Sequence, residues 1–162
     1  MKKKFLYIYN HLIKLSKNEN LYINLTSKDT FSDRLHIFLI HYAFFLKNYK
    51  NQDNKKNMQN LYDFIFRQIE LSIREIGYGD QTINKKMKDV INIFHSIISE
   101  IHFWDTYSEI EKNKKISFFL ENFKNSTFLS IYFNNFDNNL KKITFNSYLE
   151  RVEDPNYGSS ET

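Results

Sequence analysis

The chain has 162 residues, a length typical of one domain, and 41% of them are hydrophobic, enough for a core without disulfide bonds. With 3 glycines and 1 proline it lacks the turn residues of a β-sandwich or barrel, so the composition favours an all-α fold. The absence of cysteine excludes thiolate nucleophiles and cysteine-ligated metal centres. The net charge of +4 comes mostly from lysine, and scarce arginine argues against specific DNA recognition.

The N-terminal segment, residues 1–17, begins with three consecutive lysines, Lys2–Lys4, and continues with apolar residues at helical spacing. It resembles a signal peptide only superficially, because polar residues interrupt the apolar run and no small-residue cleavage site follows. We expect an amphipathic helix, which either packs on the domain or lies on a membrane surface. No stretch of the chain approaches the roughly 20 apolar residues of a membrane-spanning helix.

An all-α domain is expected over residues 18–153, beginning with a polar connection that ends near Thr30. Thr30 or Ser32 can cap a helix that runs to about Tyr49. This helix is apolar on nearly every side over Leu35–Leu46, and such a helix is normally central in a bundle.

The third and fourth helices each carry an apolar stripe at spacings of three and four residues, which predicts one buried face for each. The third helix is expected to stop at Gly77, and the fourth to open after Asp80. The stripes are Met58, Leu61, Ile65, Ile69, Ile73 and Ile76 in the third helix, and Met87, Val90, Ile91, Phe94, Ile97, Ile98, Ile101 and Trp104 in the fourth.

Shorter helices are predicted near residues 116–124 and 126–141, with a further one through Tyr148. The fold class is therefore an all-α, single-domain bundle of about five to seven helices. The tail, residues 154–162, holds the only proline and almost no apolar residues, so we expect it to be disordered.

Two of the three glycines lie in the segment Arg74–Asp80, which indicates a backbone requirement at that point. Gly77 can adopt a left-handed conformation that closes the third helix. Gly79 can allow a sharp reversal, and the Asp80 carboxylate can cap the fourth helix. Glu70 and Arg74, four residues apart on one helix face, are expected to pair.

Three lysines, Lys85, Lys86 and Lys88, are expected in the first turns of the fourth helix. The helix dipole disfavours cations there by about 0.3–1 kcal/mol each. Two interpretations remain open: a solvated charged face, or a basic surface presented to an acidic partner.

Segments of the sequence match the motifs of a known family. Its members carry an Arg-Glu-Met-Gly-Val-Gly-Asp core, a segment of the Ser-Val-Gly-Lys type and later Phe-Tyr-Gly-Arg. The core is matched by Arg74, Glu75, Gly77, Gly79 and Asp80, and the next segment by Thr82, Ile83, Lys85 and Lys88, with Asn84 in place of the glycine. Phe94 keeps the later aromatic residue, whereas His95-Ser96-Ile97 depart from Tyr-Gly-Arg. On these residues, and on Arg34 and His41 upstream, the chain resembles the ubiquinol–cytochrome c chaperone family over about residues 31–104.

The resemblance implies a non-enzymatic assembly factor for respiratory complex III that acts on newly made cytochrome b. It implies a small helical partner protein, contact with the ribosome, peripheral association with the inner membrane, and no cofactor or metal. Without an evident transit peptide the location expected is cytoplasmic, or the matrix side in an organelle. The motif residues Arg74, Glu75, Gly77, Gly79, Asp80, Lys85 and Lys88 are then the expected partner- or client-binding group, and Arg34, His41 and Phe94 the structural group.

Two other classes of function remain open from the residues alone. His41 or His95 is a possible haem ligand, and His95 with His102, seven residues apart on one helix face, is a possible metal pair. Lysine pairs at the helix ends, such as Lys55-Lys56 and Lys141-Lys142, allow a ribosome- or RNA-associated module. No catalytic triad can be nominated, so we expect no enzyme.

Overall fold

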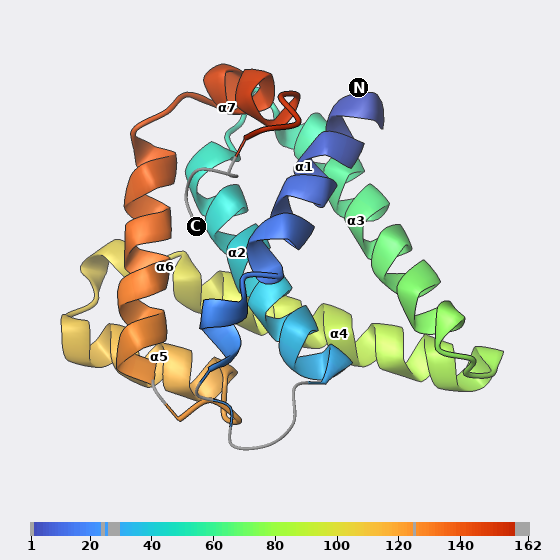
Figure 1. Cartoon of the computed structure of the whole chain (residues 1–162). Helices are drawn as coiled ribbons and strands as arrows, with labels where there is room; N and C mark the ends of the chain where they lie inside the picture. The colour runs from blue at the N-terminus through green and yellow to red at the C-terminus, as the bar shows by residue number, and fades with distance from the viewer. Residues whose placement is uncertain (1, 24, 26–29, 125, 158–162) are drawn as a thin grey trace.

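The computed structural model describes residues 2–23, 25, 30–124 and 126–157, and all its regular elements there are helices (Figure 1). The prediction of an all-α bundle is confirmed. The described residues form seven α-helices and two 3₁₀ helices, η1 and η2. Their bounds are α1 Lys2–Ser16, η1 Glu19–Tyr22, α2 Phe31–Tyr49, α3 Lys55–Glu75, α4 Asp80–Ile101, η2 Trp104–Thr106, α5 Glu109–Phe119, α6 Ser126–Lys141 and α7 Phe145–Val152.

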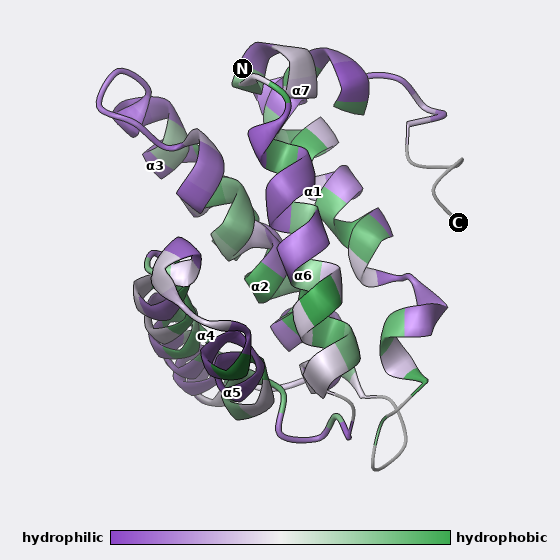
Figure 2. Cartoon of the chain, turned by 90° about the vertical axis from the view of Figure 1, so that its left-hand side faces the viewer, coloured by the Kyte–Doolittle hydropathy of each residue, from purple (hydrophilic) through white to green (hydrophobic). Residues whose placement is uncertain are grey.

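Helix α2 is the central element, as its nearly continuous apolar sequence predicts. It packs against α1, α4 and α6, and buries an unbroken run of residues from Ile37 to Phe45. Figure 2 shows hydrophobic residues gathered on the inner faces of the helices and hydrophilic residues on the outer turns. Burying so many side chains of one helix requires neighbours on several sides, which the bundle supplies.

Helix α2 begins with a reciprocal pair of hydrogen bonds at Thr30, which is therefore the cap rather than Ser32. The Thr30 hydroxyl accepts a hydrogen bond from the Asp33 N–H (3.2 Å), and the Asp33 carboxylate accepts one from the Thr30 N–H (3.1 Å). Asp33 is buried and also accepts from the Asn122 amide (3.1 Å). The capping box thus ties the start of α2 to the loop that precedes α6.

The prediction of a helix near residues 116–124 is wrong in its bounds. Helix α5 begins earlier, because Ser108 and Glu111 form a second capping box, and it ends at Phe119. Trp104 belongs to η2 rather than to α4, which ends at Ile101. Polar residues at the start of α5 concealed this helix from a search for apolar spacing.

Helix α1 is part of the same core. Its Phe5, Ile8 and Leu12 are buried, and it packs against α2, α3 and α7. Residues 154–157 of the expected tail form a turn, and the ring of Tyr157 lies 4.9 Å from that of His11. Residues 158–162 of that tail lie outside the described residues. Over the described part of the chain, no helix has both the length and the apolarity needed to cross a bilayer.

A charged network joins α2 to α6. The Asp137 carboxylate, 1% exposed, lies 3.1 Å from Lys47 Nζ, 2.9 Å from Lys141 Nζ and 2.8 Å from the Asn48 amide. Lys47 also pairs with Asp105 (2.9 Å). A buried carboxylate needs such partners, because an uncompensated charge in the core is strongly disfavoured.

Candidate functional site

The turn between α3 and α4 holds the sequence motif. Helix α3 ends at Glu75, and Gly77 follows with φ +102°, a backbone conformation that favours glycine. The Gly77 N–H donates to the Arg74 carbonyl (3.0 Å), and Gly79 is the residue that precedes α4. The conformation predicted for Gly77 is therefore confirmed. All residues from Arg74 to Asp80 are exposed.

Arg74 joins the two helices across this turn. Its guanidinium lies 3.1 Å from the Glu70 carboxylate and 2.8 Å from that of Asp80. The first of these pairs was predicted. Hydrogen bonds from Arg67 and Arg74 lower the pKa of Glu70, and those to Asp80 and Glu70 raise the pKa of Arg74. Because the groups are exposed, the pairs orient the turn more than they stabilise the fold.

Two local predictions for this turn are wrong. Asp80 does not cap α4, since it is the first residue of that helix and its carboxylate is paired with Arg74. Gly79 does not need to be glycine for a reversal, because φ −72° and ψ 160° are ordinary extended values and an added Cβ would meet nothing within 4 Å. Gly77 alone carries the backbone requirement.

The dipole argument for the lysines is also wrong. Because α4 begins at Asp80, Lys85 is its sixth residue, beyond the first turn to which the dipole effect is confined. Lys85 and Lys88 are exposed, and Lys86 Nζ lies 4.5 Å from the centroid of the Tyr78 ring. The lysines therefore form a solvated face beside the turn, with one of them held by a cation–π contact.

A hollow of about 440 Å³, the turn hollow, lies between the start of α2, the end of α3 and the first half of α4. Leu35, Leu39 and Val90 contribute apolar side chains to its lining. Its lining also includes exposed apolar side chains: Phe31 is 43% exposed, Ile76 51% and Tyr78 41%.

Sequence reasoning missed this hollow. Ile76 was expected in the buried stripe of the third helix, but α3 ends one residue before it and its side chain is exposed. Its place beside Gly77 was the available signal, since a residue at a helix end easily leaves the buried face. Phe31 carries no such signal, because its proximity to the turn depends on how α2 packs against α3 and α4.

The residues expected as a structural group have different surroundings. His41 is fully buried, with Nδ1 at 2.8 Å from the Ile37 carbonyl and Nε2 at 2.7 Å from the Tyr132 hydroxyl. Burial lowers the pKa of His41 to about 3, so the ring is neutral. Phe94 is buried and stacks on Tyr42, ring centroids 5.0 Å apart. Arg34 is exposed at the start of α2, 5.1 Å from the centroid of the Tyr22 ring.

These contacts bear on the hypotheses that histidines of this chain bind haem or a metal ion. Both ring nitrogens of His41 are engaged in hydrogen bonds, so neither is directed at an open haem site. His95 Nε2 lies 3.2 Å from the Tyr62 hydroxyl, and His102 follows the end of α4. Across the described ranges, no three His, Cys, Asp or Glu residues are placed to hold a metal ion.

A hollow with exposed apolar side chains at its rim and exposed lysines nearby on α4 is a surface suited to contact with another molecule. Comparison with known protein families narrows the class of protein further. Residues 24–101 match the family model described as ubiquinol-cytochrome C chaperone, which confirms the resemblance found in the sequence. The match includes α2, α3, the turn and α4, and so all of the turn hollow. No curated protein and no solved structure matches the chain significantly.

Proposed function

We propose that the protein is a non-enzymatic assembly chaperone for respiratory complex III and that its client is newly made cytochrome b. The family match over α2–α4 is the observation that carries this proposal, because the family consists of chaperones for the ubiquinol–cytochrome c reductase. A membrane-protein client exposes apolar helices before assembly, and a chaperone has to cover some of that surface.

The client surface proposed is the turn hollow together with the motif residues Arg74–Asp80. Phe31, Ile76 and Tyr78 offer apolar contact area at its rim, in the manner of a groove that receives one face of a helix. Lys85 and Lys88 lie nearby on α4 and favour acidic groups on a client or a partner. Arg74 holds α3 and α4 at the angle that shapes this surface.

A small helical partner and the ribosome are the further contacts that we propose. The net charge of +4 supports a loose, salt-sensitive attraction to ribosomal RNA or to an anionic membrane surface. The location proposed is peripheral to the inner membrane, on its cytoplasmic side in a bacterium or its matrix side in an organelle.

Removal of the gene in the native host tests the function. We expect less assembled complex III and a weaker cytochrome b absorbance, both restored when the gene is returned. Normal complex III in the deletion strain would contradict the chaperone proposal.

A matched pair of variants tests the surface. Ile76→Asp places a charge at the rim of the turn hollow, whereas Ile131→Asp makes the same change on α6, where the isoleucine is 58% exposed. We expect the first variant to lose co-purification of cytochrome b and the second to retain it, with unchanged circular dichroism in both. Charge reversal at Lys85 and Lys88 should weaken capture less severely. Equal capture by both isoleucine variants would exclude the hollow as the client surface.

A further inference from the structure

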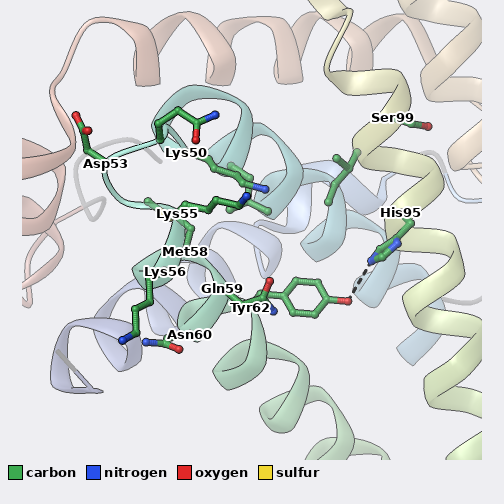
Figure 3. A pocket seen from close by; sticks show the side chains of 13 residues that line it. Lys50, Asp53, Lys55, Lys56, Met58, Gln59, Asn60, Tyr62, His95 and Ser99 are labelled. Carbon is green, nitrogen blue, oxygen red and sulfur yellow. Dashed lines mark hydrogen bonds between the residues drawn. The ribbon is translucent and has the colours of Figure 1, made fainter.

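A second cleft lies at the other end of α3 from the turn hollow. Its volume is about 910 Å³, and it separates the α2–α3 corner from α4 (Figure 3). Tyr62 and Ile73 are the lining residues of the two sites that come nearest along α3, and they are separated by about 16 Å of helix. This cleft, the lysine cleft, is therefore separate from the proposed client surface.

Cations dominate the corner side of the lysine cleft. Lys50, Lys55 and Lys56 line it, and none of them forms an ion pair with a described residue. In Figure 3 the Lys50 and Lys55 side chains extend from the corner toward α4. Asp53 of the same corner also lines the cleft, so three lysines and one aspartate leave its lining with a net positive charge.

The position of Lys55 and Lys56 adds to this imbalance. They are the first two residues of α3, whose first turn has no acidic residue, and Asn54 makes no side-chain cap. Its amide instead donates to the Tyr49 carbonyl (2.7 Å). The helix dipole disfavours cations at a helix start. An anion bound here would offset both the positive charge of the lysines and the positive end of the α3 dipole.

The opposite wall supplies polar groups and apolar surface. The Tyr62 hydroxyl and the His95 ring nitrogen, 3.2 Å apart, meet across the cleft from α3 and α4 (Figure 3). Leu46 and Ile98 contribute apolar side chains. Concave sites of this size that combine charge with apolar walls are typical of small-molecule ligands.

We propose that the lysine cleft binds a phosphate-bearing molecule. Lys50 and Lys55 contact the phosphate, the Tyr62–His95 pair donates to its oxygens, and the apolar wall covers the rest of the molecule. Phosphate fits better than a carboxylate because its several oxygens can engage donors from both walls together. The phosphate can belong to a soluble metabolite or to a lipid headgroup.

Binding of defined probes by the full-length protein tests this proposal. The soluble probe is glycerol 3-phosphate, measured by titration calorimetry, and the membrane probe is phosphatidylglycerol vesicles, with phosphatidylcholine vesicles as reference. The test variant is Lys50→Gln with Lys55→Gln, and the control is Lys85→Gln with Lys88→Gln, which removes the same charge from α4. Unchanged circular dichroism and thermal midpoint establish that both variants are folded.

We expect the test variant to bind about tenfold or more weakly than the control, because two charge-assisted contacts to the phosphate are lost. The His95 ring signals should shift when the wild-type protein is saturated. Binding of the soluble probe identifies a metabolite, and binding of anionic vesicles alone identifies a headgroup; either result supports the site. Equal weakening in both variants, or no binding of either probe, would overturn it. Client capture does not enter these measurements, so failure here is distinct from failure of the proposed function.

Discussion

The neutral, buried His41 makes the stability of the fold depend on pH. Its pKa falls from 6.5 to about 3, first because burial disfavours the charged ring, while the hydrogen bond to Ile37 opposes the shift and the charge of His11 adds to it. The unfolded chain therefore binds a proton that the folded chain excludes. Stability is complete above pH 6.5 and declines as the pH falls from 6.5 toward 3.

The size of the effect follows from the interval between 6.5 and the working pH. At pH 5 that interval is about 1.5 pKa units, and each unit corresponds to about 1.36 kcal/mol, so His41 contributes a loss of about 2 kcal/mol. The loss of about 2 kcal/mol does not depend on the exact pKa of His41 in the folded protein, provided that this pKa lies well below 5. Burial also lowers the pKa of His11, to about 4, so its contribution has the same sign.

Urea denaturation at pH 7.5 and pH 5.0 measures the effect in the wild type and in His41→Gln, whose side chain cannot titrate. Between the two pH values we expect the wild type to lose about 2 kcal/mol more than the variant. His102→Gln, a change at an exposed ring, should retain the wild-type difference. The same loss in His41→Gln as in the wild type would refute the assignment, and so would an NMR titration of the His41 ring above pH 5.

Three further predictions concern the fold. Gly77→Ser should destabilise the protein by about 1–2 kcal/mol, because φ at Gly77 is +102°. Gly79→Ser should be neutral or should stabilise the protein by up to about 0.5 kcal/mol, because the serine can cap α4. Equal losses of stability in urea denaturation would contradict this contrast. The Tyr42 hydroxyl is buried with no hydrogen-bond partner among the described residues. Tyr42→Phe should therefore leave the thermal midpoint unchanged or raise it. A clear fall in the midpoint would show that the hydroxyl has a partner. Asp137→Ala should lower the free energy of unfolding by about 3 kcal/mol, because Lys47 loses its buried partner. Replacing both residues with apolar ones should recover most of that loss. If urea denaturation shows no recovery, the pair has another role.

The helical class and the central helix were predictable from the sequence because both depend on local pattern. Few glycines and prolines exclude frequent turns, and the apolar run of α2 requires burial on several sides wherever the other helices lie. Gly77 was predictable for a similar reason, since a helix end next to a scarce glycine indicates a positive φ. The family motif was readable in the chain for the same reason, because its residues are contiguous.

The candidate site was only partly predictable. The motif located the turn, but not the partner of Asp80 or the exposure of Ile76, since both depend on the residue at which each helix ends. The dipole argument was applied to the lysines of α4. In the structure it applies to Lys55 and Lys56 at the start of α3, where no acidic residue or side-chain cap offsets them.

The sequence alone therefore determined an all-α bundle with α2 inside it, a backbone constraint at Gly77 and a family resemblance over residues 24–101. Tertiary structure decided which distant groups meet: Asp137 with Lys47, His41 with Tyr132, and Phe31 with the α3–α4 turn. The physical reason is the distance along the chain over which each interaction acts. Periodicity, capping and glycine conformation act within a few residues, whereas hollows and buried polar pairs arise only where whole helices pack.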